Sequence, residues 1–143
     1  MRTTICAGLL LFLFGLMGCR QGAPLGPMTE TYSVEANQNQ LVVGEKQKIE
    51  ILVRYHRRKQ PAALLKYKVQ LSAPDDLKVT PNSWDVQQNL TSKEAGFNYT
   101  GLATIEVAED APAGEVEVVA KITPAQGTPT TATLKFRVAK KGG

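Results

Sequence analysis

Few residues of this sequence are suited to catalysis or metal binding. The chain has one histidine, His56, and two cysteines, Cys6 and Cys19. A zinc site takes three or four histidine, cysteine or carboxylate ligands, and a second histidine is lacking. A Ser-His-Asp triad would have to use His56, but three cations follow it and the G-x-S-x-G motif is absent. We therefore expect no enzyme, no metal and no cofactor, with His56 as a solvated loop residue.

Two pairs of adjacent carboxylates are the other candidates for chemistry. They are Asp75-Asp76 and Glu109-Asp110, and each pair stands close to a proline in a segment typical of turns. Neither segment has the alternating ligand spacing of a calcium loop. We interpret both pairs as turn residues.

Cys19 follows an apolar run that contains no charged residue, from position 5 to position 17. As a helix this run would span about 20 Å, which is short of the roughly 30 Å hydrocarbon core of a bilayer. Its length is typical of a secretory signal peptide. The run ends in Leu16-Met17-Gly18-Cys19, which resembles the lipobox of bacterial lipoproteins, with Leu at −3, a small residue at −1 and Cys at +1.

The lipobox resemblance implies a defined processing site and anchor. Cleavage would fall between Gly18 and Cys19, so that residues 1–18 are the signal peptide and Cys19 carries diacylglyceryl and a further acyl chain such as palmitate. Several chains together hold a protein stably on a membrane. Met17 departs from the small or branched residue usual at −2, and Cys19 after an uncleaved leader is the alternative. Arg20 stands where Asp is associated with inner-membrane retention in enterobacteria, which favours the outer membrane of the cell envelope.

The remainder of the chain reads as a tether and one small domain. Positions 20–30 hold two glycines and two prolines without periodicity, so we expect a lipidated tether over 19–30. The folded part contains no cysteine, which excludes disulfides and thiol chemistry there. A formal net charge of +4 for the whole chain is mild and predicts no nucleic-acid partner.

Alternation of apolar and polar residues predicts strands and no helix after residue 20. Ile49, Ile51, Val53 and Tyr55, for example, share one face. The expected strands cover 31–36, 47–55, 65–71, 77–80, 97–107, 115–123 and 130–138, with one more extended piece near Trp84. Seven or eight such strands predict an all-β sandwich over 31–139, followed by a tail at 140–143.

The closing half of the chain resembles the immunoglobulin-like or fibronectin-like modules of bacterial envelope proteins. In those modules Ala-Pro-x-Gly precedes two alternating strands, as Ala111-Pro112-Ala113-Gly114 does here. The Val-Gly-Glu turn at 43–45 is similar to the entry of their second strand. The resemblance implies an immunoglobulin-like fold and no particular function.

A basic loop is the polar feature with the clearest functional interpretation. Arg57, Arg58 and Lys59 follow the second long strand, and in an antiparallel sandwich that strand ends where the first strand begins. The loop would then face the membrane, where each cation contributes about 1 kcal/mol near anionic headgroups. A solvated loop without function is the alternative.

Trp84 is the one tryptophan and the remaining candidate contact residue. It could anchor a partner or, with Tyr67 or Tyr99, stack on a sugar, but a single tryptophan in a sandwich more often belongs to the core. The sequence thus favours a lipid-anchored, non-enzymatic binding or scaffolding module that contacts another envelope protein. A carbohydrate-binding module is the alternative, and it requires an exposed aromatic side chain beside Asn or Gln donors.

Overall fold

A computed structural model describes residues 30–58 and 61–142 of the chain. Throughout this part the regular structure is β-strand. The described part has no helix of the length and hydropathy needed to cross a membrane. The expected signal peptide, nearly all of the tether, Cys19 and Lys59 lie outside the described residues.

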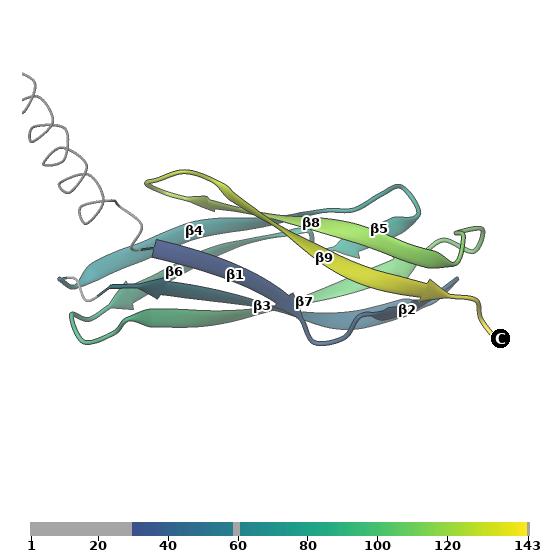
Figure 1. Ribbon diagram of the computed structural model, residues 1–143, viewed down its shortest axis with the longest axis horizontal. Helices are drawn as coiled ribbons and strands as arrows, with labels where there is room; N and C mark the ends of the chain where they lie inside the picture. The colour runs from purple at the N-terminus through teal and green to yellow at the C-terminus, as the bar shows by residue number, and fades with distance from the viewer. Residues whose placement is uncertain (1–29, 59–60, 143) are drawn as a thin grey trace, which may run out of the picture. The chain divides into compact units, whose positions relative to one another are not determined.

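Nine strands make up the described domain (Figure 1). They are β1 (Glu30–Ala36), β2 (Gln40–Val42), β3 (Lys46–Arg57), β4 (Ala63–Ser72), β5 (Leu77–Thr80), β6 (Ser83–Leu90), β7 (Gly96–Val107), β8 (Gly114–Pro124) and β9 (Thr130–Ala139).

The strands form two sheets, ordered β1-β3-β7-β5 and β2-β9-β8-β4-β6. Immunoglobulin domains place strands A, B, E and D in one sheet and G, F and C in the other. The order β1-β3-β7-β5 matches the first sheet and β9-β8-β4 the second, with β2 and β6 added at the two edges. The expected all-β, immunoglobulin-like sandwich is confirmed.

Two strands differ from the sequence-based expectation. β2 is a three-residue strand that pairs in parallel with β9, too short to give a periodic pattern. β6 runs for eight residues, because the face that begins with Trp84 and Val86 continues through Gln88 to Leu90. Gln88 is polar, so it interrupts the apolar alternation by which the strand would have been recognised.

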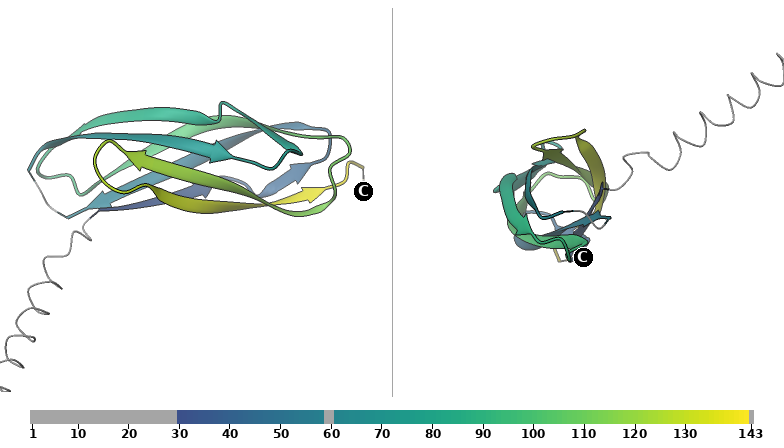
Figure 2. Two further views of the ribbon diagram at one scale, coloured as in Figure 1. Left: turned by 90° about the horizontal axis from the view of Figure 1, so that it is seen from above. Right: turned by 90° about the vertical axis from the view of Figure 1, so that its left-hand side faces the viewer.

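The two sheets face each other (Figure 2). The core lies between them and is built mainly from the inward-facing residues of the long strands. Ile49, Ile51 and Val53 of β3 are each at most 1% exposed, as their spacing predicts. On the opposite sheet the side chains that are at most 1% exposed are those of Leu41, Val69, Val118, Ala120, Ile122 and Phe136.

The chain changes sheets between β5 and β6. β5 pairs with β7 only along Leu77–Thr80, opposite residues 104–107. After the cis peptide bond Thr80-Pro81, β6 pairs with β4 in the other sheet. As a result, residues 96–103 of β7 have a strand neighbour on the β3 side alone.

Candidate functional site

One end of the sandwich gathers the start of β1, the end of β3 and the β6–β7 turn. β1 and β3 are neighbouring strands that run in opposite directions, since Asn37 N–H donates to the Glu50 carbonyl at 3.0 Å and Arg54 Nη1 lies 3.0 Å from Glu35 Oε1. The start of β1 and the end of β3 therefore lie at the same end of the described domain (Figure 1). We call this the entry end.

Arg57 does not belong to an exposed basic loop, contrary to the expectation. It is the last residue of β3 and is 1% exposed, because it continues the inward-facing series of Val53 and Tyr55. Its neighbour His56 is likewise a strand residue, although it is exposed as expected.

The guanidinium of Arg57 holds two loops together through backbone carbonyl groups. Nη2 donates to the carbonyl oxygen of Thr91 at 2.8 Å, Nε to that of Glu94 at 3.2 Å, and Nη1 to that of Pro61 at 3.3 Å. The Glu94 carboxylate in turn accepts the Thr91 N–H at 2.8 Å. Burial of the charge is offset by these charge-assisted hydrogen bonds, so the role of Arg57 is structural.

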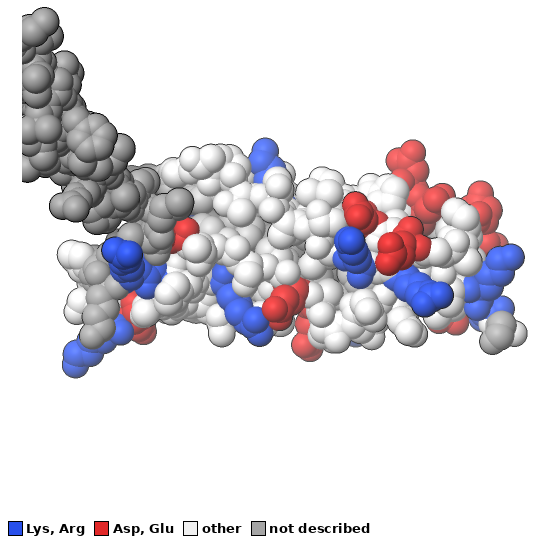
Figure 3. Space-filling model, in the orientation of Figure 1, with Lys and Arg blue, Asp and Glu red and all other residues white. Residues whose placement is uncertain are grey.

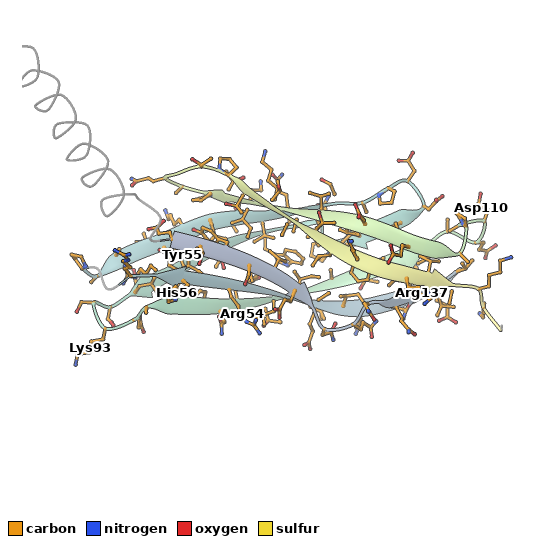
Figure 4. All side chains as sticks on the ribbon, viewed as in Figure 1. Arg54, Tyr55, His56, Lys93, Asp110 and Arg137 are labelled. Carbon is orange, nitrogen blue, oxygen red and sulfur yellow. The ribbon has the colours of Figure 1, made fainter. Side chains whose placement is uncertain are left out.

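The exposed cations of the entry end are therefore a different set from the one expected. Arg58 is exposed, and Lys59 lies outside the described residues. Lys93, on the β6–β7 turn that Arg57 holds, is exposed at the same end (Figure 4). The sequence could not indicate Lys93, because it stands far along the chain from Arg58 and only the tertiary fold brings the two to one end.

The opposite end of the sandwich carries acidic and basic side chains next to each other (Figure 3). Both predicted turn pairs, Asp75-Asp76 and Glu109-Asp110, lie in turns there, and Ala108 N–H donates to the Asp76 carbonyl at 2.8 Å. The described residues contain no group of three or more His, Cys, Asp or Glu side chains arranged to hold a metal ion.

Trp84 covers the core on the side where β5 does not extend along β7. It faces inward from β6 and lies over Gly101 of β7, where an added Cβ would come 2.9 Å from indole Cε2. Trp84 packs against the core but is partly exposed, as are the inward-facing Phe97 and Tyr99 of β7. We call this side, formed by β6 and residues 96–103 of β7, the open side.

The open side presents unpaired backbone groups on β7. Arg57 N–H donates to the Ala95 carbonyl at 2.8 Å and Val107 N–H to the Glu45 carbonyl at 3.1 Å, so odd-numbered residues of this stretch bond toward β3. The even-numbered residues point the other way. Among the described residues, the backbone groups of Asn98, Thr100 and Leu102 have no hydrogen-bond partner.

The three aromatic residues considered for sugar stacking do not form an exposed platform. Tyr67 is 3% exposed, and Trp84 and Tyr99 are partly buried against the core. A groove of about 520 Å³ on the outer face of β4, β6 and β8 offers Lys66, Lys68 and Gln87, but the Tyr67 that borders it is buried. Tyr67 is therefore excluded as a stacking group, whereas Trp84 and Tyr99 are partly exposed and the carbohydrate alternative stays a prediction.

Tyr67 carries a hydroxyl group without a hydrogen-bond partner among the described residues. Burial, and secondarily the neighbouring Tyr99, raise the pKa of Tyr67 well above its usual value of 10.0. Its ring packs edge-on against Tyr32 at a centroid distance of 5.3 Å. Tyr67 is thus a core residue with an unsatisfied polar atom.

Comparison with known proteins adds remote structural likenesses. No protein-family model and no curated protein sequence matches this chain. A PapD-like domain of human CEP192 is 12% identical with a TM-score of 0.46, over 75% of this chain and 84% of that one. Self-complemented MyfA, the major subunit of Myf fimbriae from Yersinia enterocolitica, is 12% identical with a TM-score of 0.45, over 76% and 99%.

A further likeness is to a family 123 glycoside hydrolase from Clostridium perfringens, 11% identical with a TM-score of 0.45. It covers 79% of this chain, which spans about a quarter of that enzyme, 27% of its length. Likenesses of this size say nothing about activity. The immunoglobulin-like assignment rests on the strand order of the two sheets.

Proposed function

We propose that this protein is a non-enzymatic, lipid-anchored component of the bacterial cell envelope whose sandwich domain binds another envelope protein. The anchor is the acylated Cys19, and the outer membrane is the favoured location. The single observation that carries the proposal is the lipobox Leu16-Met17-Gly18-Cys19, placed shortly before a domain that starts at residue 30.

The distribution of charge over the domain supports this proposal. The first strand begins at the end that carries Arg58 and Lys93, and the two acidic turn pairs lie at the other end. A domain tethered through β1 would place Arg58 and Lys93 near anionic headgroups and the two acidic turn pairs away from them. A partner would then meet the opposite end or the sides of the sandwich.

The anchor is tested by metabolic labelling of the full chain with an alkyne analogue of palmitate in a bacterial host. We expect label on the wild type and on Cys6→Ala, because Cys6 lies within the predicted signal peptide. Cys19→Ala should lose the label and accumulate at the mass of the uncleaved chain. Label that persists in Cys19→Ala, or is lost in Cys6→Ala, would contradict the proposal.

A further inference from the structure

We propose that the open side binds an extended strand of a partner protein, which pairs with β7 along residues 96–102, in line with β5. This deepens the proposed function by naming the surface and the kind of partner, and it rests on that function only for the partner's place in the envelope. The added strand would extend the sheet β1-β3-β7 over the length that β5 leaves uncovered.

The unpaired backbone groups of β7 indicate that the partner binds as a β-strand. Asn98, Thr100 and Leu102 present a row of N–H and C=O groups at the spacing of a β-ladder, and such a row is satisfied by another strand. The stretch is regular, since β3 and β7 pair residue by residue from Lys46 opposite Glu106 to His56 opposite Gly96. It contains no proline and no charged residue, which are the devices that keep other strands away from an edge.

The side chains beside this edge define the partner strand further. Residues opposite Phe97, Tyr99 and Gly101 would point inward, toward the partly exposed rings and Trp84. Leu102 is 53% exposed, and a side chain of the partner strand would lie beside it on the outer face of the sheet. Asp85 is the one charged side chain among residues 83–90 and 96–103. The geometry therefore favours an uncharged strand that alternates apolar and polar residues, with a small residue near Gly101.

Trp84 makes the proposal measurable, because it is the one tryptophan of the chain and borders the proposed slot. The probe is an acetylated and amidated heptapeptide, Thr-Val-Thr-Ala-Thr-Val-Thr, titrated into the full-length protein in a non-ionic detergent. We expect a saturable shift of tryptophan emission to shorter wavelength and less quenching by acrylamide. The same peptide with proline at its third and fifth positions should have no effect.

Two matched variants locate the strand. Thr100→Pro removes an N–H that faces the open side of β7, and it should weaken peptide binding about tenfold. Gln87→Pro makes the equivalent change on the free edge of β6, and it should leave binding unchanged. Each variant is first compared with the wild type in its urea midpoint. If Thr100→Pro fails to fold, Leu102→Lys, at an exposed side chain of the same edge, takes its place with the same expected loss.

Other results would overturn the proposal. Binding lost in Gln87→Pro and kept in Thr100→Pro would place the strand on β6. An emission shift of the protein alone that grows with its concentration would mean that a second copy fills the edge. The absence of any shift would also overturn it. The titration does not depend on Cys19, so failure of the palmitate labelling and failure of strand binding are separate outcomes.

Discussion

Trp84 and Gly101, which belong to facing sheets, are in contact so close that residue 101 has no room for a side chain. A Cβ there would stand 2.9 Å from Cε2 and 3.1 Å from Cδ2 of the indole. The contact joins β6 to β7 at the place where the sandwich lacks a strand. The contact explains why a glycine stands in the middle of β7, because a glycine within a strand is otherwise unfavourable.

Gly101→Ala should therefore destabilise the domain. The methyl group would push the indole or the β7 backbone away, and overpacking of this kind typically costs about 1–3 kcal/mol. The free energy of unfolding is measured by urea denaturation, followed by the emission of Trp84. Thr100→Ala, at the exposed neighbouring position, is the control and should stay close to the wild type. An equal midpoint for Gly101→Ala and the wild type would contradict the close contact.

Arg57→Ala should be among the most destabilising single changes in the domain. It leaves the carbonyl groups of Pro61, Thr91 and Glu94 without their donor, and hydrogen bonds to charged groups contribute about 1.5–3 kcal/mol each. We expect a loss of about 3 kcal/mol in the free energy of unfolding. Arg58→Ala removes an exposed cation one residue away and should change stability by less than about 0.5 kcal/mol. Similar losses in both variants would show that the hydrogen bonds of the Arg57 guanidinium are not the cause.

Tyr67→Phe should stabilise the domain slightly and alter its response to high pH. Removal of a buried hydroxyl group without a partner should raise the free energy of unfolding by about 1 kcal/mol at pH 7. Because the folded-state pKa of Tyr67 is raised, its unfolded form loses a proton first as the pH rises above 10.0. Stability from this residue is thus complete below that pH and falls above it, by about 1.4 kcal/mol per pH unit.

The test compares urea midpoints of wild type and Tyr67→Phe between pH 8 and the alkaline limit at which the domain still folds. The difference between the two should widen above pH 10.0 in favour of the variant. Parallel pH profiles would mean that Tyr67 ionises equally well in the folded protein.

The entry end should bind anionic membranes through Arg58 and Lys93. Each cation near such a surface contributes about 1 kcal/mol, so each replacement by Ser should weaken vesicle binding about fivefold. The measurement is co-sedimentation of an unacylated fragment beginning at residue 30 with phosphatidylglycerol vesicles at low salt. Replacement of Lys135 and Arg137 by Ser, on β9, is the matched change in charge and should have a smaller effect. Equal losses in the two double variants would remove the entry end from consideration.

The strands could be predicted from the sequence where apolar and polar side chains alternate clearly. The prediction was incomplete where they do not. The series Ile49, Ile51, Val53 and Tyr55 predicted β3, and its period of two, carried one step further, points to Arg57 as an inward-facing residue. The charge of Arg57 and of its neighbours suggested a solvated loop instead. Gln88 concealed most of β6 in the same way, because one polar residue broke the apolar face.

The open side could not be predicted from local patterns at all. It arises because β5 ends after four residues and the chain crosses to the other sheet, which is a matter of pairing partners and not of residue type. Lys93 and Arg58 share an end for a similar reason. Trp84 was identified as a core or contact residue, and the structure gives it both a core contact and a partly exposed face.

The hydrogen bonds that Arg57 donates also affect how the domain tolerates acidity. The three groups that accept hydrogen bonds from the Arg57 guanidinium are peptide carbonyls, which do not titrate. A carboxylate partner would have made the bonds of Arg57 sensitive to the lower pH beside an anionic bilayer, where protons accumulate. The bonds from Arg57 to Pro61, Thr91 and Glu94 instead have acceptors that do not change with pH, so the contacts that they make should persist at the surface where the proposed anchor would hold the domain.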